Sequence, residues 1–310
     1  MNKKDIFGAL IFMVVAAFLL GAAWLYRQHS NAALVRGQYV FANTRDNMQN
    51  LAHIRLITAG GETNIYKQDY DWRVKEAEDY FVNANRLTDF YEMINNSLIE
   101  TVAPADEETK KEKQLNAESA TKIITYNADD EVLDEIIIGK HYKGTSAYAY
   151  SPDNKKYYYV ISNVGALSGK SENWLPYPLL SVDDYLISKI KTPKLDADHE
   201  QIRQLLAGSL EFKRAAEVLG YIGYDKIMRK SEFQNLQKEQ QRRLEITMVG
   251  GLIYVLDIYH INDAYWLGIT LKADKVSRKE VPPFVGANQK YFADWLFGLN
   301  KRQGETLFEM

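Results

Sequence analysis

Residues 51–74 read LAHIRLITAGGETNIYKQDYDWRV, and this stretch decides the fold. Two runs rich in strand-favouring residues flank Gly60 and Gly61. A glycine pair suits a tight hairpin because glycine reaches positive φ without a Cβ clash. The stretch therefore predicts strand, turn and strand, and Asp71–Val74 continues the antiparallel meander.

Similar patterns recur downstream. Residues 121–164 predict two hairpins, TKIITYN with LDEIIIGKHY and TSAYAYS with KYYYVIS. A Pro-Asp-Asn turn closes the second hairpin, since Pro presets φ and Asn tolerates the left-handed region. Residues 244–273 predict another set of strands around a second Gly-Gly turn.

The two Gly-Gly hairpins have related surroundings. Ile57–Thr58 precedes the first glycine pair and Ile246–Thr247 the second, and each hairpin leads to a tryptophan, Trp72 or Trp266. This indicates a weak internal duplication, although two unrelated hairpins could share these features.

Helices are expected between the strands. Apolar residues at spacings of three and four predict a helix over 79–99, and helical stretches are expected at 197–219 and 226–241. Residues 100–120 are dense in charge, so we expect an exposed loop there, with a partner-binding segment as the alternative. The pattern predicts an α+β fold of two similar subdomains, built of antiparallel hairpins with packed helices.

Residues 6–26, IFGALIFMVVAAFLLGAAWLY, carry no charge. As a helix they would span roughly 31 Å, close to the ~30 Å hydrocarbon core of a bilayer. Trp24 and Tyr26 fit the membrane–water interface, so we predict a single transmembrane anchor. A cleaved signal peptide with Lys3 and Lys4 as its basic region is the alternative, whereas a core helix would be amphipathic.

The orientation follows from the short basic tail, although Arg27, Arg36 and Arg45 nearly balance it on the other side. We expect a single-pass protein of the bacterial inner membrane with a cytoplasmic N-terminus and a periplasmic C-terminal region. The predicted parts are a cytoplasmic tail (1–5), the anchor (6–26), a stalk (27–50), a first α+β subdomain (51–193, with the charged loop 100–120) and a second α+β subdomain (194–310).

Composition narrows the chemistry. The formal net charge of −3 does not indicate a nucleic-acid partner. The chain has no cysteine, which excludes disulfides, thiolate zinc sites and thiol catalysis.

Two segments resemble catalytic or nucleotide-binding motifs, but their residue spacing differs from that of the motifs. Gly165–Ser171 resembles a P-loop but has three residues, rather than four, before Gly-Lys-Ser, and prolines follow it. Ser168 lacks the first glycine of a nucleophile elbow. The five histidines are too scattered in sequence to share a helix face or strand edge, and acidic pairs stand at turn and cap positions. We predict no catalytic, cofactor-binding or metal-binding residue and no cofactor.

A tyrosine-rich hairpin is the candidate binding surface. Its tyrosines are Tyr148, Tyr150, Tyr157, Tyr158 and Tyr159. They could stack against a glycan or lipid headgroup, although cross-strand packing on a hairpin is the favoured interpretation.

The order of elements resembles a known family. Its motifs here are Gly60-Gly61-Glu62, Trp72, the strand around Val160, and Trp174 with Leu179-Leu180, and the resemblance covers roughly residues 51–300. The chain resembles the membrane-anchored domain-of-unknown-function family encoded beside gliding-type or ABC-2-type transporter subunits. The resemblance implies a periplasmic, non-enzymatic accessory to an envelope transporter. The resemblance implies no active-site residue in this chain.

Three functions therefore stand as hypotheses. The leading one is a non-catalytic scaffold of an envelope transporter complex, which would contact the bilayer through residues 6–26 and protein partners through its folded part. The alternatives are a periplasmic glycan- or lipid-binding module using the tyrosine-rich hairpin, and an anchored hydrolase with a non-local site. The sequence does not determine the oligomeric state.

Overall fold

The computed structural model describes residues 35–310 apart from 117, 155–156, 166 and 234–239. The chain divides into two units. The first comprises the described residues up to Arg73 together with Ala84–Trp174, and the second comprises Val74–Asn83 together with Leu175–Met310. The predicted anchor, with Trp24 and Tyr26, lies outside the described residues.

One antiparallel sheet forms the centre of the first unit, with strand order β3-β2-β1-β6-β7-β8-β9-β5. Its strands are β1 (Leu51–Thr58), β2 (Gly61–Gln68), β3 (Asp71–Val74), β5 (Ile99–Pro104), β6 (Thr121–Asn127), β7 (Val132–Lys143), β8 (Ser146–Tyr150) and β9 (Tyr157–Ile161). Its helices are α2 (Ala42–Asp46), α3 (Ala84–Asn96), α4 (Glu107–Glu112) and the 3₁₀ turns η1 (Met48–Asn50), η3 (Pro152–Asn154) and η4 (Ser171–Trp174).

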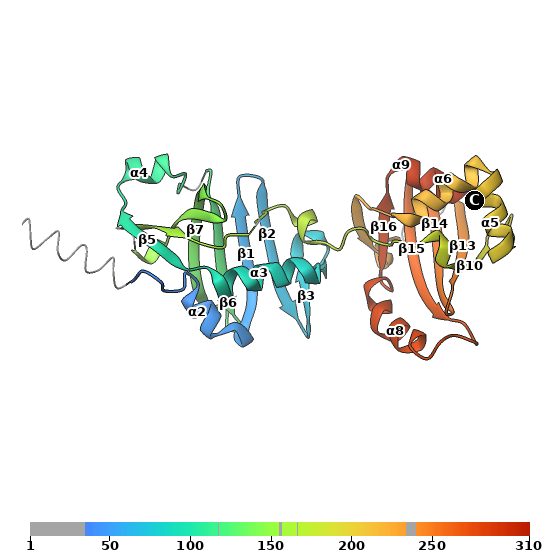
Figure 1. Cartoon of the computed structure of the whole chain (residues 1–310), viewed down its shortest axis with the longest axis horizontal. Helices are drawn as coiled ribbons and strands as arrows, with labels where there is room; N and C mark the ends of the chain where they lie inside the picture. The colour runs from blue at the N-terminus through green and yellow to red at the C-terminus, as the bar shows by residue number, and fades with distance from the viewer. Residues whose placement is uncertain (1–34, 117, 155–156, 166, 234–239) are drawn as a thin grey trace, which may run out of the picture. The chain divides into compact units, whose positions relative to one another are not determined.

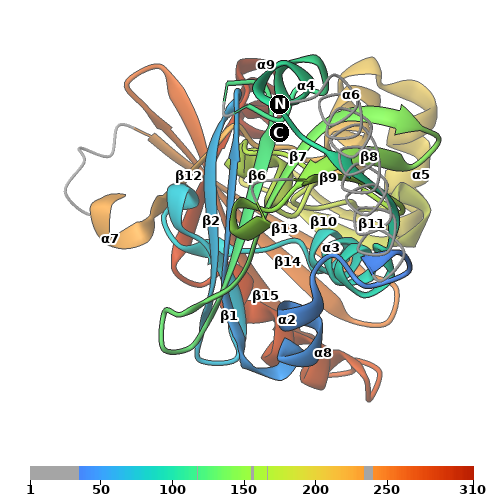
Figure 2. The same ribbon diagram turned by 90° about the vertical axis from the view of Figure 1, so that its left-hand side faces the viewer.

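The first Gly-Gly hairpin is confirmed. β1 and β2 pair antiparallel from His53↔Tyr66 to Thr58↔Gly61, and Figure 2 shows them as long neighbouring strands. Ile54 and its partner Ile65 are both fully buried, which is the cross-strand burial that the alternation of side chains predicts.

The second unit contains another antiparallel sheet, in the order β11-β10-β13-β14-β15-β16-β12. Its strands are β10 (Ile187–Lys191), β11 (Asp196–Asp198), β12 (Lys226–Arg229), β13 (Gln240–Met248), β14 (Leu252–Ile261), β15 (Ala264–Ala273) and β16 (Trp295–Leu299), and the short strand β4 (Tyr80–Phe81) also belongs to this unit. Its helices are α5 (His199–Gly208), α6 (Leu210–Gly220), α7 (Lys230–Phe233), α8 (Val281–Asn288), α9 (Lys301–Glu309) and the 3₁₀ turns η2 (Lys75–Ala77), η5 (Asp184–Leu186) and η6 (Gln289–Tyr291).

The second Gly-Gly hairpin, β13–β14, and its continuation into β15 are confirmed. The chain is therefore a mixed α+β protein with two antiparallel sheets. The strand orders of the two sheets differ, so the duplication of the subdomains stays a prediction.

Several segments differ from their predictions. The expected charged loop at 100–120 contains most of β5, which pairs with β9, and helix α4, which Asp106 caps by accepting a hydrogen bond of 2.7 Å from the backbone N–H of Thr109. The helix expected over 226–241 begins instead as strand β12, because Lys226–Arg229 pairs with the buried strand β16.

Residues after Trp174 pack in the second unit, whereas the sequence analysis placed the division between subdomains at 193. The backbone N–H of Leu179 donates to the carbonyl of Ile222, and that of Val182 donates to Leu219. β10 then pairs with β13. The segment from Leu175 to β10 therefore belongs to the second unit.

Part of the predicted stalk is folded into the first unit. Phe41 is fully buried and precedes α2, but its side chain cannot cap that helix. Asp134 of β7 supplies the missing acceptor, since its Oδ2 accepts hydrogen bonds from the backbone N–H of Thr44 (2.7 Å) and from Thr44 Oγ1 (2.6 Å). Thr44 Oγ1 also shares a hydrogen bond of 2.6 Å with Thr125 Oγ1, and both threonines are fully buried.

The hydrogen-bonded group of Asp134, Thr44 and Thr125 predicts how the stability of the fold depends on pH. Burial raises the pKa of the Asp134 carboxyl above its ordinary value, despite the hydrogen bonds from Thr44 that act in the opposite direction. A raised pKa means that folding favours the protonated acid, so its contribution to stability is complete below the ordinary pKa and is lost as pH rises through the folded-state pKa.

We therefore expect the free energy of unfolding of the native chain, relative to Asp134→Asn, to fall as pH rises from below 4 toward neutrality. Urea unfolding of both proteins over this pH range measures the difference. Because both proteins share the other carboxylates, the contributions of those groups to the pH dependence cancel. A difference that is flat with pH would contradict the assigned burial effect.

Candidate functional site

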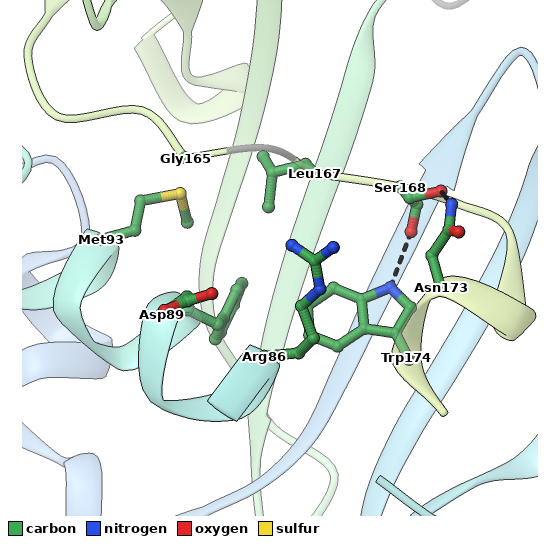
Figure 3. A pocket seen from close by; sticks show the side chains of 9 residues that line it. Arg86, Asp89, Met93, Gly165, Leu167, Ser168, Asn173 and Trp174 are labelled. Carbon is green, nitrogen blue, oxygen red and sulfur yellow. Dashed lines mark hydrogen bonds between the residues drawn. The ribbon is translucent and has the colours of Figure 1, made fainter. Parts of the chain in front are cut away.

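A pocket of about 300 Å³ lies between helix α3 and the loop 165–174 in the first unit. In Figure 3 the side chain of Arg86 extends from α3 toward Leu167 of the loop, and Asp89 lies farther along the same helix, on the side of Met93. The lining residues are Arg86, Asp89, Phe90, Met93, Gly165, Leu167, Ser168, Asn173 and Trp174. The pocket therefore combines an aromatic and aliphatic floor with two charged side chains at its rim.

The loop is held by its own polar groups. The indole Nε1 of Trp174 donates to the carbonyl of Ser168 at 2.8 Å, drawn as a dashed line in Figure 3. Ser168 Oγ accepts hydrogen bonds from the backbone N–H of Lys170 (3.1 Å) and from Asn173 Nδ2 (2.7 Å). These bonds form a side-chain-stabilised turn at the segment that resembles a P-loop.

The Trp174 ring connects this loop to α3. Trp174 is 4 % exposed, and its ring meets Phe90 edge to face, with the centroids 6.1 Å apart. Such pairs contribute about 0.5–1.5 kcal/mol beyond their buried area. Tyr91 of α3 packs against Trp72 of β3, with the two ring centroids 6.4 Å apart. Burial raises the pKa of the Tyr91 hydroxyl to about 12.

A close backbone approach fixes the loop against the β1–β2 hairpin. A Cβ at Gly169 would overlap the carbonyl oxygen of Gly61 and the hydroxyl of Thr58. Gly61 has φ +141°, and a Cβ there would lie 3.0 Å from the carbonyl oxygen of Gly169. Gly169 is therefore required for steric reasons, and Gly61 chiefly because its positive φ favours glycine.

The polar side chains of the lining are those of Arg86, Asp89, Ser168 and Asn173, together with the indole N–H of Trp174. Of these nine described residues none is a histidine, cysteine or lysine, and the Ser168 hydroxyl is occupied by two donors from its own loop. Nucleophilic catalysis requires a base within hydrogen-bond reach of the nucleophile. The geometry suits the binding of an apolar group with polar contacts at the rim.

A family model for DUF4340, a domain of unknown function, matches residues 72–237, which is more than half of the chain. The chain belongs to the DUF4340 family. No curated protein and no solved structure matches it.

The pocket lies wholly inside the region matched to DUF4340, since its lining runs from Arg86 to Trp174. The match begins within β3 and so excludes the Gly60–Gly61 turn that supports the loop. Sequence reasoning missed Arg86, Asp89, Phe90 and Met93, although their spacing of three and four along α3 placed them on one face.

The tyrosines of the DUF4340 chain's candidate binding surface divide between the two faces of the sheet. Tyr148 and Tyr158 meet edge to face at 5.7 Å, and Tyr142, which sequence reasoning missed, lies 5.3 Å from Tyr148. Tyr159 pairs with Ala149, lies on the opposite face and is 6 % exposed, whereas Tyr150 shares the face of Tyr148 but is only 8 % exposed. The side chain of Tyr157 is outside the described part of the structure.

Lysines of α4 and its C-terminal end cover part of this tyrosine ladder, defined as Tyr142, Tyr148 and Tyr158. Lys113 Nζ lies 4.8 Å from the ring centroid of Tyr148, and Lys110 Nζ lies 4.8 Å from that of Tyr150, which is on the same face but outside the ladder. Hydrogen bonds with Glu112 and Glu107 raise the pKa of Lys113 and Lys110, so both are charged at neutral pH. The most open ring of the ladder is Tyr142, which is 56 % exposed.

Two histidines, His53 and His260, stack on tyrosine rings. His53 stacks on Tyr126 at 4.8 Å and its Nε2 hydrogen-bonds Asn64 Oδ1 at 3.0 Å, while His260 stacks on Tyr265 at 4.5 Å. Within the described residues, no group of three or more His, Cys, Asp or Glu side chains is arranged to hold a metal ion. Over the same part of the chain, no helix is long and apolar enough to cross a membrane.

The glycine contact predicts a pair of contrasting variants. We expect Gly169→Ala to lower the free energy of unfolding by about 1–3 kcal/mol, because the hairpin or the loop must move to admit the methyl group. Gly165→Ala is the matched control, since a Cβ there meets nothing within 4 Å and the loop is the same. Denaturant unfolding of both variants measures the contrast, and equal losses would show that the close approach does not govern the loop.

Proposed function

We propose that this chain is a non-catalytic, membrane-anchored accessory protein of the bacterial envelope that associates with an ABC-type transporter complex. The main support is the hydrogen bonding in the pocket. Asn173 Nδ2 donates to Ser168 Oγ, and the Trp174 indole donates to the Ser168 carbonyl, so these groups hold the loop together. This arrangement favours binding over reaction. Membership of a domain-of-unknown-function family agrees with the resemblance noted in the sequence but carries no activity.

The proposed location rests on sequence. Residues 6–26 have the length and composition of a single bilayer span, so we propose an inner-membrane protein with its folded units in the periplasm. The span would contact lipid, and the folded units would contact the transporter. A reporter fused after Met310 tests the orientation, since activity only in the cytoplasm would overturn it.

Affinity capture tests the proposed association. The tagged full-length chain, solubilised from its native membranes, is expected to enrich transporter subunits. The matched control keeps residues 1–34 and replaces the rest by an unrelated folded domain, which removes enrichment caused by the hydrophobic segment alone. Equal recovery from both proteins would contradict the proposal.

A second candidate function is glycan or lipid-headgroup binding at the tyrosine ladder. The exposed ring of Tyr142 beside Tyr148 favours it, since an open aromatic face can stack on a sugar. An anchored hydrolase with a non-local site is a weaker alternative, because His53 and His260 are engaged in stacking.

The ladder hypothesis has a direct test. We expect Tyr142→Ala to weaken retention on immobilised envelope glycan, because it removes the most exposed ring of the ladder. Tyr70→Ala is the control, since Tyr70 is 96 % exposed and stands in the turn between β2 and β3. If both variants are retained like the native chain, the ladder is not a glycan site.

A further inference from the structure

Several segments at one end of the second sheet, where β13 meets β14 and where β15 ends, carry exposed apolar side chains. Hydrogen bonds join the segments that carry them: Val249 N–H donates to the Leu186 carbonyl at 2.7 Å, and Arg278 N–H donates to the Gly250 carbonyl at 2.9 Å. This apolar end consists of Tyr185, Leu186, Val249, Val276 and Phe284.

Helix α8 extends the apolar end. Its sequence, VPPFVGAN, has no charged side chain. Pro282, Pro283 and Phe284 are nevertheless exposed, and Phe284 is 45 % exposed. A helix that faces water normally carries polar or charged residues on its outer side, so this face is suited to an apolar environment.

The segment that leads into α8 is locally basic in an acidic chain. Residues 272–280 read KADKVSRKE, with four bases and two acids. Lys275, Arg278 and Lys279 are exposed around Val276, which is 88 % exposed. Asp274 is only half-exposed, and its Oδ1 accepts a hydrogen bond from the backbone N–H of Lys275 at 2.6 Å.

The part of the apolar end around Tyr185 carries acidic rather than basic residues. Asp183 and Asp184 adjoin Tyr185, and Asp183 Oδ2 accepts a hydrogen bond of 3.4 Å from the Tyr185 hydroxyl. The side that combines apolar and basic groups is therefore that of Val276 and Phe284.

We propose that this side, defined as the loop 275–279 with α8, docks on the surface of an anionic lipid bilayer. Val276 and Phe284 enter the boundary between headgroups and acyl chains, while Lys275, Arg278 and Lys279 meet the lipid phosphates. Exposed Val276 and Phe284, with three exposed bases and one exposed acid, Glu280, in the segment between and beside them, match this chemistry better than they match a protein groove. The inference goes beyond the transporter association and does not depend on it.

The absence of cysteine in the chain permits a clean experiment. Val276→Cys and Phe284→Cys in the full-length protein are each labelled with an environment-sensitive fluorophore and reconstituted in nanodiscs containing phosphatidylglycerol and spin-labelled lipid. We expect a blue-shifted emission and several-fold stronger quenching by the spin-labelled lipid than for labelled Tyr70→Cys, at a position of the first unit that is 96 % exposed.

A charge test separates electrostatic attraction from simple proximity. In the labelled Phe284→Cys protein, reversal of Lys275, Arg278 and Lys279 to Glu is expected to remove most of the quenching. The matched control reverses three exposed bases of α5 and α6 and is expected to keep it; these are Arg203, Lys213 and Arg214. Thermal unfolding confirms that each variant is folded.

Three results would overturn the proposal. The first is quenching at positions 276 and 284 no stronger than at position 70. The second is a blue shift without quenching by the spin-labelled lipid, which would indicate cover by protein. The third is quenching that survives the reversal at 275, 278 and 279. None of these results depends on whether a transporter is captured.

Discussion

The first unit depends on a backbone contact between two glycines. A Cβ at Gly169 of the pocket loop would overlap the carbonyl oxygen of Gly61 in the β1–β2 turn, and Gly61 itself has a positive φ that favours glycine. The contact fixes the loop so that the carbonyl of Ser168 receives the Trp174 indole N–H. Trp174 then packs on Phe90 of α3, so the sheet, the loop and the helix that enclose the pocket are held by consecutive contacts.

The two Gly-Gly hairpins could be predicted from sequence because their determinants are local. Strand-favouring runs on both sides of a glycine pair specify strand, turn and strand within a short segment. The second requirement on Gly61 could not be predicted in the same way, since its neighbour Gly169 is far away in the chain. The same holds for Asp134, which supplies the acceptor for helix α2 from β7.

Composition misled where tertiary pairing decides the structure. The charged segment 100–120 has few large apolar residues, yet its first part is strand β5 because β9 offers an edge to pair with. Lys110 and Lys113 then pack on tyrosine rings, so the charge density that indicated a solvated loop partly covers the candidate binding surface. The tyrosines themselves were predicted as one surface, but alternation along β8 and β9 sends Tyr159 into the core.

The proposed anchor at residues 6–26 and the proposed lipid contact of the second unit would act on the same bilayer, and physical chemistry connects the two proposals. The apolar end of the second unit offers few side chains, so its contact with a bilayer would be weak for a free protein. A chain held to the same bilayer by residues 6–26 would make that contact intramolecularly, at a high effective concentration. A single helix restrains distance but leaves orientation free. A second, weak lipid contact through Val276 and Phe284 would restrain orientation, which is what an accessory protein requires in order to present one face to a neighbouring membrane complex.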